Sequence, residues 1–307
     1  MPSPCAPMSW FTVRVPASSA NLGPGFDALG LALSLFLTCR FRPSDALTIR
    51  VQGRDAAAIP DNPENLIWQT ALAVARSLRL GMPPIELEIH NEIPLGKGMG
   101  SSAAALTAGV VIADELLELG WKPLRILDEA ARLEGHPDNV APCTLGSIVA
   151  SAIDSGGVTR AVRLPLPKSF DLAIVVPDFD LPTAKARAVL PSGYSREDAV
   201  FNVQRAALLI AALATGTTTV FPAAIEDRFH QPYREALVPG LHEILRLRAP
   251  GLLGCALSGA GPSILVFFER GYEAVCQLVE QIFRINGHAS ETLHCSIPER
   301  GFELTRE

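Results

Sequence analysis

Residues 94–102 have the sequence Pro94-Leu95-Gly96-Lys97-Gly98-Met99-Gly100-Ser101-Ser102, and this stretch joins a predicted strand to a predicted helix. Ile85–His90 before it alternates apolar and polar residues, which is typical of a half-buried strand. Ser101–Leu119 after it is rich in alanine and leucine, which favours a long, largely buried helix. Glycines let backbone N–H groups approach an anion closely, and helix N-termini attract phosphate. The stretch therefore predicts a phosphate-binding turn.

Side chains of the same turn strengthen this interpretation. The hydroxyls of Ser101 and Ser102 can reach a phosphate oxygen or a magnesium ion, and Lys97 adds a local positive charge. The chain has neither the GxxxxGK[ST] pattern of a Walker A loop nor a GxGxxG dinucleotide fingerprint at this point. On this stretch alone, an ordinary strand-to-helix turn with a serine cap remains an equal alternative.

Composition restricts the class of protein. The 307 residues are 48% hydrophobic and 19% charged, and the formal net charge is -6. Such a chain can bury the core of one large domain or of two ordinary ones. Its mild acidity provides no general attraction for nucleic acid or anionic lipid, so we expect neither partner. A bound phosphate group would have to be held by local groups.

Cysteine spacing and the N-terminus indicate a cytoplasmic protein. The six cysteines are scattered, without a CxxC pair or a zinc-ligand cluster, so a disulfide framework is not expected. Residues 1–9 contain no secretory signal and are predicted to be a short disordered tail, with Met8 as an alternative start. Apolar runs such as 206–214 fall short of the roughly 18 residues that span a bilayer.

The remaining pattern predicts an α+β protein, because strands and helices are mixed without strict βαβ alternation. We place a soft domain boundary near residue 155, where Ser155-Gly156-Gly157 predicts a turn between two strands. Further predicted strands are 11–15, 35–41, 46–51, 171–176 and 264–268; predicted helices are 64–80 (capped by Asp61 or Asn62), 123–134, 196–214 and 273–285.

Three other stretches carry candidate site residues. Pro16–Asp27 is rich in small and turn-forming residues and predicts a loop, in which Asn21 and Asp27 are suited to grip a hydroxyl or an ammonium group. Glu134–Asn139 places polar side chains after a predicted helix, and a carboxylate near a phosphate loop is a natural magnesium ligand. Leu257–Ser263 precedes a predicted strand and has glycines that permit close backbone approach.

Together these stretches resemble the GHMP kinase superfamily and, within it, the homoserine kinase family. Pro94–Ser102 matches the superfamily phosphate loop, and Ser18–Asp27 is similar to the first motif in its homoserine kinase form. His136–Pro142 resembles the HxDNVAP segment, and Leu257–Ser263 resembles the third motif. Leu181–Pro191 and His230–Arg234 are similar to two further family segments, each of which contains an arginine.

The resemblance implies a two-domain GHMP kinase fold. Residues 10–155 would form a ribosomal protein S5 domain 2-like N-terminal domain that binds ATP, and residues 156–307 a ferredoxin-like C-terminal domain. It implies ATP and Mg²⁺ as cofactors, L-homoserine as the phosphoryl acceptor, a role in threonine biosynthesis and a homodimer. The implied ATP site comprises Pro94, Leu95, Gly96, Lys97, Gly98, Met99, Gly100, Ser101, Ser102, Ala103 and Ala104.

The resemblance also implies roles for particular side chains. Arg187 and Arg234 would hold the homoserine carboxylate, Asp27 the ammonium group, and Asn21, His136 and Asn139 the hydroxyl and the remaining polar edge. Among these, Asn139, Arg187 and His136 are the predicted catalytic residues. Glu134 is the predicted magnesium ligand, with Ser101 or Ser102 as a second oxygen donor, and Glu129 or Asp128 as alternatives to Glu134.

The proton of the acceptor hydroxyl poses a separate question. Many related kinases have an aspartate base where this chain has Asn139, so we expect catalysis by in-line alignment, with Asp138 as an alternative base. Two rival functions stay open. One is a GHMP kinase that acts on another alcohol, such as mevalonate or a sugar; the other is a member that has lost catalysis and only binds metabolites or partners.

Overall fold

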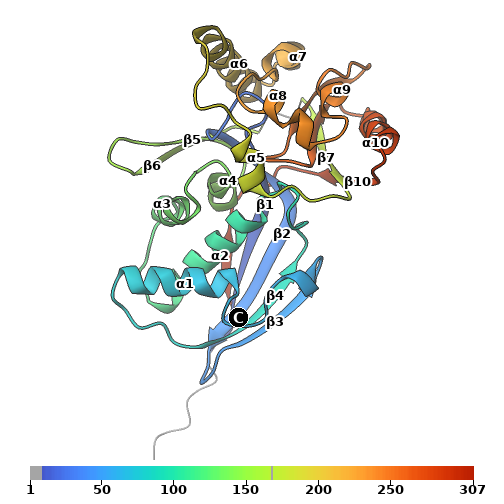
Figure 1. The fold of residues 1–307 in the computed structure, drawn as a ribbon. Helices are drawn as coiled ribbons and strands as arrows, with labels where there is room; N and C mark the ends of the chain where they lie inside the picture. Colours follow the sequence, from blue (N-terminus) through green and yellow to red (C-terminus); the bar gives the residue numbers. More distant parts are fainter. Residues whose placement is uncertain (1–8, 167–168) are drawn as a thin grey trace, which may run out of the picture.

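The protein is described by a computed structural model that covers residues 9–166 and 169–307. The predicted tail therefore lies outside the described residues, except for Ser9. Two sheets with flanking helices make up the fold, as the α+β prediction requires (Figure 1). The five cysteines among the described residues are free.

The first sheet has seven strands. They run in the order β11-β1-β2-β4-β3, and β5 pairs with the other end of the long strand β2 and with β6. Only β3 and β4 pair in parallel among these strands. The strands are β1 (Phe11–Ala20), β2 (Leu29–Pro43), β3 (Thr48–Gly53), β4 (Ile85–Asn91), β5 (Ile148–Ile153), β6 (Thr159–Leu164) and β11 (Glu303–Arg306).

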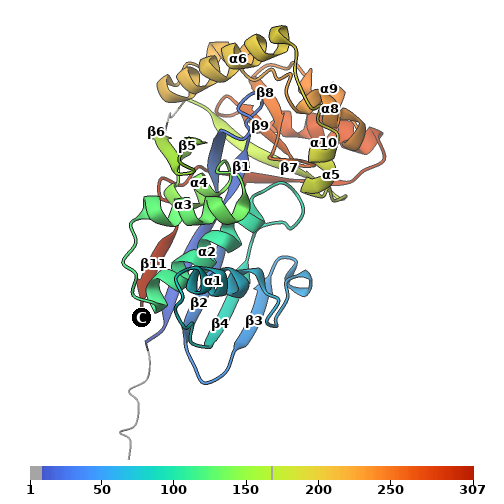
Figure 2. The same ribbon diagram turned by 60° about the vertical axis from the view of Figure 1, so that its left-hand side comes forward.

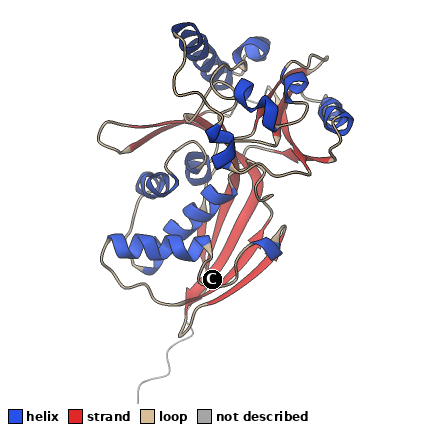
Figure 3. Cartoon of the chain, in the orientation of Figure 1, coloured by secondary structure: helices blue, strands red, loops and turns tan. Residues whose placement is uncertain are grey.

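Helices cover one face of this sheet, and the alternation of its residues explains why. Leu37, Cys39 and Phe41 of β2 are buried beneath the helices, whereas Arg40 and Arg42 point the other way. Figure 3 shows the helices gathered on one side of the strands. These helices are α1 (Leu66–Ser77), α2 (Ser101–Leu116), α3 (Pro123–Glu134) and α4 (Val140–Leu145).

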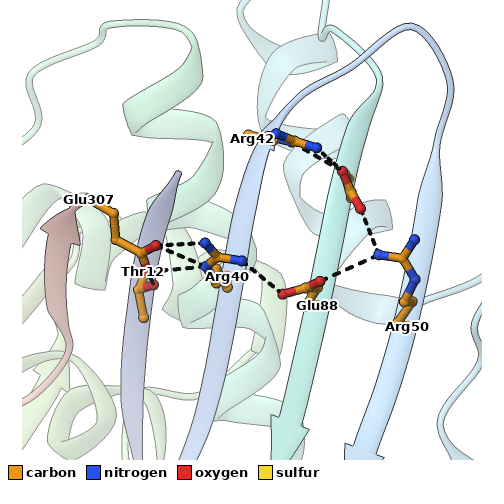
Figure 4. Close-up of polar contacts among 7 residues, drawn as sticks. Thr12, Arg40, Arg42, Arg50, Glu88 and Glu307 are labelled. Atoms are coloured by element: carbon orange, nitrogen blue, oxygen red, sulfur yellow. Dashed lines mark hydrogen bonds and ion pairs between the residues drawn. The ribbon is translucent and has the colours of Figure 1, made fainter. Parts of the chain in front are cut away.

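The opposite face of the first sheet carries a ladder of ion pairs (Figure 4). Arg40 bridges Glu307 after β11 and Glu88 on β4, with N–O distances of 2.7 and 3.3 Å. Arg42 and Arg50 both reach Glu86, at 2.7 and 2.6 Å. Half-exposed pairs of this kind contribute little individually, so the ladder serves mainly to make this face polar.

The second sheet is antiparallel, with strand order β10-β7-β9-β8. Its strands β7, β8 and β9 are labelled in Figure 2. Helices follow its first and third strands, which gives the βαββαβ order and the 4-1-3-2 arrangement of a ferredoxin-like fold, as predicted. Its strands are β7 (Asp171–Pro177), β8 (Leu252–Leu257), β9 (Ile264–Phe268) and β10 (Ser290–Cys295); its helices are α5 (Thr183–Ala188), α6 (Arg196–Thr215), α7 (Phe221–Ala224), α8 (Gln231–Arg234), α9 (Leu241–Leu245) and α10 (Cys276–Ile285).

The division of the chain at residue 155 stays a prediction. Beyond that residue, β6 still belongs to the first sheet, because it pairs with β5. The strand β11 also returns from the end of the second sheet to pair with β1. The first sheet is therefore built from residues on both sides of the predicted boundary.

Helix α6 is longer than the apolar run 206–214 that it contains, and by length and composition it could cross a membrane. Among the described helices, it alone combines 18 or more residues with sufficient mean hydropathy, 1.2, and 22% of its most apolar window is buried. Its Leu209 and Leu213 pack in the core together with Phe267 of β9. The predicted lack of membrane association stays a prediction.

Candidate active site

A cavity of about 200 Å³ lies where the turn before α2 meets loops of the second sheet. Most of the predicted site residues border it, although they come from six separate stretches of the chain. The lining residues are Asn21, Phe26, Pro94, Gly96, Lys97, Gly98, Met99, Gly100, Ser101, Ser102, Glu134, His136, Asp138, Asn139, Leu181, Pro182, Thr183, Arg187, Arg234, Gly259 and Ala260.

The glycines of the phosphate loop are required by its conformation and its neighbours. Gly96, Gly98 and Gly100 have φ values of 67°, 72° and 68°, a region that L side chains rarely adopt. A Cβ on Gly98 would lie 2.2 Å from the carbonyl oxygen of Ser258. The Ser258 hydroxyl in turn donates to the Gly98 carbonyl at 2.7 Å. The third motif thus packs directly against the loop, and α2 begins immediately after it at Ser101.

The remaining residues of the predicted ATP stretch have different surroundings. Lys97 pairs with Asp180 at 2.8 Å and donates to the carbonyl of Phe179 at 2.8 Å, so part of its charge is already neutralised by the second sheet's loops. Leu95 does not border the cavity, and its backbone N–H donates to Asp55 at 3.0 Å. Ala103 and Ala104 are fully buried in α2. Lys97 is therefore a link between the two sheets as well as a cavity residue.

Glu134 ends α3 and faces the start of α2, where it accepts a hydrogen bond from the Ser102 hydroxyl at 3.2 Å. Burial raises the pKa of this carboxyl. A partly buried carboxylate beside a serine hydroxyl and the turn before α2 supplies the oxygen donors that Mg²⁺ takes, and the cation would offset the cost of removing this charge from water. No hydrogen bond joins Ser101 to Glu134.

The alternative carboxylates for the metal are engaged elsewhere. Glu129 is buried and paired with Arg125 and Arg132 at 3.1 and 2.5 Å. Asp128 accepts from the backbone N–H of Thr159 at 3.0 Å and pairs with Arg125 at 2.8 Å. Neither borders the cavity, whereas Glu134 does; the assignment of a metal ligand among the three carboxylates stays a prediction.

His136, Asp138 and Asn139 form the wall beyond Glu134. The His136 Nδ1–H donates to Asp138 at 2.6 Å, and this hydrogen bond is the main reason why the pKa of His136 is raised. The Asn139 backbone N–H also donates to Asp138, at 2.9 Å. The Asn139 side-chain oxygen accepts from Ser18 at 2.9 Å. Both contacts use Oδ1 of Asp138, and Asp138 borders the cavity, so its role as the alternative base stays a prediction.

Asn21 holds two loops together. Its backbone is left-handed, with φ of 70°, and its side chain is almost fully buried. The side-chain amide donates to the carbonyl of Gly259 at 2.9 Å and accepts from the Asp27 backbone N–H at 3.0 Å. Asn21 borders the cavity, but both ends of its amide already fix the loop that carries Asp27. Its predicted contact with substrate stays a prediction.

Asp27 and Arg187, 160 residues apart, pair with each other through two hydrogen bonds of 2.7 and 3.1 Å. Such a fork is the geometry in which a guanidinium binds a carboxylate. Asp27 does not border the cavity itself. However, one carboxylate oxygen of Asp27, one of Asp138 and one ring nitrogen of His136 all lie within 4.8 Å of one another. The predicted ammonium and carboxylate binders are therefore adjacent and neutralise each other.

Arg234 is 1% exposed and reaches the cavity from α8. Its guanidinium donates to the carbonyls of Ala186 and Gly259 at 3.1 and 3.2 Å, and to His230 Nδ1 at 2.9 Å. Burial lowers its pKa to about 10, so it stays charged at neutral pH. His230 is also buried, which lowers its pKa, and its other ring nitrogen contacts the Gly23 carbonyl at 2.8 Å. The neutral imidazole therefore accepts from Arg234.

Sequence reasoning missed several residues of this site. Phe26 borders the cavity, and its ring stacks on that of His230 with the ring centroids 5.2 Å apart. Thr183 borders the cavity from the start of α5. Ser18 and Asp180 lie behind it, in contact with Asn139 and Lys97. Phe26, Thr183 and Ser18 fall within stretches that had been singled out, but nothing in the spacing distinguished them from their neighbours.

Comparison with known proteins identifies the family. Residues 65–147 match the GHMP kinases N terminal domain, and residues 209–281 match the GHMP kinases C terminal domain. The homoserine kinase of Solibacter usitatus is 91% identical over 97% of this chain and 98% of its own length. The homoserine kinase of Deinococcus radiodurans is 48% identical over 88% of this chain and 87% of its own.

Solved structures agree with these sequence relatives. The crystal structure of homoserine kinase from Cytophaga hutchinsonii superposes with a TM-score of 0.84 and 28% identity, covering 98% of this chain and 99% of that one. Lactococcus lactis galactokinase in complex with galactose shares only the fold, with a TM-score of 0.70 and 14% identity over 96% of this chain and 95% of that one. The chain belongs to the GHMP kinase superfamily and, within it, to the homoserine kinase family.

Proposed function

We propose that this protein is a homoserine kinase, which transfers the γ-phosphoryl group of ATP to the side-chain hydroxyl of L-homoserine and forms O-phospho-L-homoserine for threonine biosynthesis. The observation that carries the proposal is a single cavity bordered by the phosphate loop Pro94–Ser102 and by the charged groups Arg187 and Arg234, with Asp27 behind them. An anionic nucleotide and a zwitterionic acceptor each find complementary groups there.

The acceptor site matches the three polar ends of L-homoserine. Asp27 takes the ammonium group, and Arg187 and Arg234 hold the carboxylate. To bind in this way, the zwitterion replaces the Asp27–Arg187 pair with two new ion pairs. One joins Asp27 to the ammonium group, and the other joins Arg187 to the carboxylate. Molecules that carry one charge only would leave Asp27 or Arg187 without a partner. His136 and Asn139 lie toward the phosphate loop, where the hydroxyl must be.

Phosphoryl transfer depends on alignment and on neutralisation of the phosphate charge. Glu134 and Ser102 would hold Mg²⁺, with Ser101 as a further hydroxyl at the helix start; bound Mg²⁺ neutralises phosphate oxygens. Arg187, His136 and Asn139 then act as the catalytic side chains, by orienting the acceptor hydroxyl and stabilising charge on the transferred group. Asp138 stays bound to His136 and keeps its ring in place.

The test is an assay of ADP release by the purified protein with ATP, Mg²⁺ and one acceptor at a time. We expect turnover with L-homoserine and at least a hundredfold lower kcat/KM with L-serine, L-threonine or mevalonate. Stronger turnover with mevalonate or a sugar would instead support a kinase for another alcohol. Tight ATP binding without ADP release from any acceptor would indicate a member that has lost catalysis.

A homodimer in the cytoplasm completes the proposal. An apolar surface is available for a second copy along α6, where Val200 and Val203 are 48% and 66% exposed. Light scattering of the purified protein tests this assembly, and we expect twice the monomer mass of 32.7 kDa. A monomeric mass at micromolar concentration would remove the dimer from the proposal without affecting the proposed reaction.

A further inference from the structure

Ser18 lies at the contact between the phosphate loop and Asn139, yet it does not border the cavity. It belongs to β1 and is fully buried. Its backbone N–H donates to the carbonyl of Met99 at 3.1 Å, and its hydroxyl donates to the Asn139 side-chain oxygen at 2.9 Å. A Cβ on Gly100 would lie 1.9 Å from the same hydroxyl oxygen. The glycine of the loop is thus needed to accommodate Ser18.

The direction of the hydrogen bond between Ser18 and Asn139 follows from a third partner. The Cys143 thiol donates to the Ser18 oxygen at 3.5 Å. Burial raises the pKa of Cys143 to about 12, so the thiol keeps its proton at neutral pH. Because the Ser18 oxygen accepts from Cys143, its own proton is directed at Asn139. The Asn139 oxygen is then occupied, and its NH₂ group is the end left for the cavity that Asn139 borders.

We infer that Ser18 is a positioning residue, which turns the Asn139 amide so that its NH₂ group faces the reacting atoms; this inference rests on the proposed function. An amide N–H stabilises negative charge on a phosphoryl oxygen and takes no proton. As the acceptor oxygen bonds to the γ-phosphorus, the bond to the bridging oxygen breaks and ADP leaves with its electron pair. The hydroxyl proton passes to a phosphoryl oxygen or to solvent.

The chain offers a matched control for this inference. Ser19 is the next residue, is equally buried, and its hydroxyl has no hydrogen-bond partner among the described residues. Ser18→Ala should lower kcat about tenfold, the effect of losing one buried hydrogen bond, with the KM values for ATP and L-homoserine nearly unchanged. Ser19→Ala should keep the wild-type kcat. Thermal unfolding of both variants checks that any loss of turnover is not loss of fold.

A double-mutant cycle separates positioning from a merely structural role. If Ser18 acts through Asn139, the variants Asn139→Ala and Ser18→Ala/Asn139→Ala should have the same kcat. Losses that multiply, or a wild-type kcat for Ser18→Ala, would overturn the inference. A wild-type protein that forms no ADP with L-homoserine would overturn both the inference and the proposed function, whereas normal wild-type turnover with an unaffected Ser18→Ala would overturn the inference alone.

Discussion

The two halves of the cavity, the proposed nucleotide half and the proposed acceptor half, are built in opposite ways. The phosphate loop is nine consecutive residues, and its shape depends on the backbone: three glycines in left-handed conformations and the start of α2. The acceptor half is assembled from side chains on separate stretches, such as Asp27 and Arg187, that meet only in the folded protein. The nucleotide half therefore depends on residues that have no side chain, and the acceptor half on particular charged groups.

This difference teaches which properties each half controls. Backbone N–H groups bind any nucleoside triphosphate of the right shape, because they contact the phosphates. They do not distinguish one phosphoryl acceptor from another. Charged side chains distinguish acceptors, because a ligand that lacks one charge leaves a group unpaired. Substitutions in the loop should thus affect use of ATP, and those among the charged residues should affect the choice of acceptor. The following variants test this separation.

The largest effect is expected for Gly98→Ala. The added Cβ would meet the Ser258 carbonyl at 2.2 Å in a left-handed backbone, so the loop must change shape. We expect a loss of more than about a hundredfold in kcat/KM for ATP, measured by ADP release at saturating L-homoserine. Gly81→Ala is the control, because nothing lies within 4 Å of that Cβ. Equal activity of the two variants would break the comparison.

Arg187→Ala should affect the other half alone. Removal of a guanidinium that forms two hydrogen bonds to a carboxylate costs about 2–3 kcal/mol, so kcat/KM for L-homoserine should fall about a hundredfold. The affinity for ATP, measured by calorimetry, should stay within twofold of wild type. Lys185→Ala changes an exposed residue of the same helix and should match wild type. A comparable loss of ATP affinity in Arg187→Ala would show that the halves are not separate.

Glu134→Gln tests the border between the halves and should have opposite effects on activity and stability. Activity should fall at least tenfold as a metal ligand is lost. Because burial raises the pKa of Glu134, its contribution to stability is present below the pKa of the unfolded chain, about 4.3, and is lost as pH rises through the folded pKa. The metal-free variant should therefore melt above wild type at pH 7.

The same linkage supplies the control for Glu134→Gln. As the pH is lowered toward 4, the wild-type carboxyl becomes protonated, and the two melting temperatures should converge. Added Mg²⁺ with ATP should reverse their order at pH 7, since only the wild type retains the carboxylate ligand. A variant that melts below wild type without metal at pH 7 would contradict the assigned cost of burying this charge.

The smallest effect is expected for Asp138→Asn, which acts through His136. The hydrogen bond to Asp138 raises the pKa of His136, so its contribution to stability is present below about pH 6.5 and is lost as pH rises through the folded pKa. The variant should lower that pKa, measured by NMR titration, and should lower kcat only several-fold. The stability difference from wild type should be largest near about pH 5–6 and shrink toward pH 8. A many-hundredfold loss of kcat would favour Asp138 as the base.

Helices and turns whose ends are set by neighbouring residues could be predicted from the sequence. The predicted bounds of α3, Pro123–Glu134, are those observed, because proline occupies its first turn and Gly135 ends it with φ of 90°. The turn between β4 and α2, with the helix beginning at Ser101, was likewise predicted from its own residues, whereas its phosphate binding stays a prediction. The predicted helix 273–285 was only partly right: residues 273–275 form a 3₁₀ turn before α10.

Other bounds depend on partners that no local pattern reveals. β1 was predicted to end at Val15 because Pro16 and the small residues after it are typical of a loop. The strand instead continues to Ala20, since a bulge after Pro16 restores pairing with β2. Asn65, rather than Asp61 or Asn62, caps α1, where it accepts from two backbone N–H groups. The Asp27–Arg187 and Lys97–Asp180 pairs join residues too distant for sequence spacing to predict.

The pairing of β11 with β1 has a consequence for folding during synthesis on the ribosome. One side of β1 remains an open sheet edge until residues 303–306, far later in the sequence, have been synthesised. Such an edge is a template for misplaced strands, so the nascent chain is exposed to mispairing until β11 closes the edge. Once β11 has closed this edge, Glu307 pairs with Arg40 across β1 and thereby fastens two segments that lie far apart in the sequence.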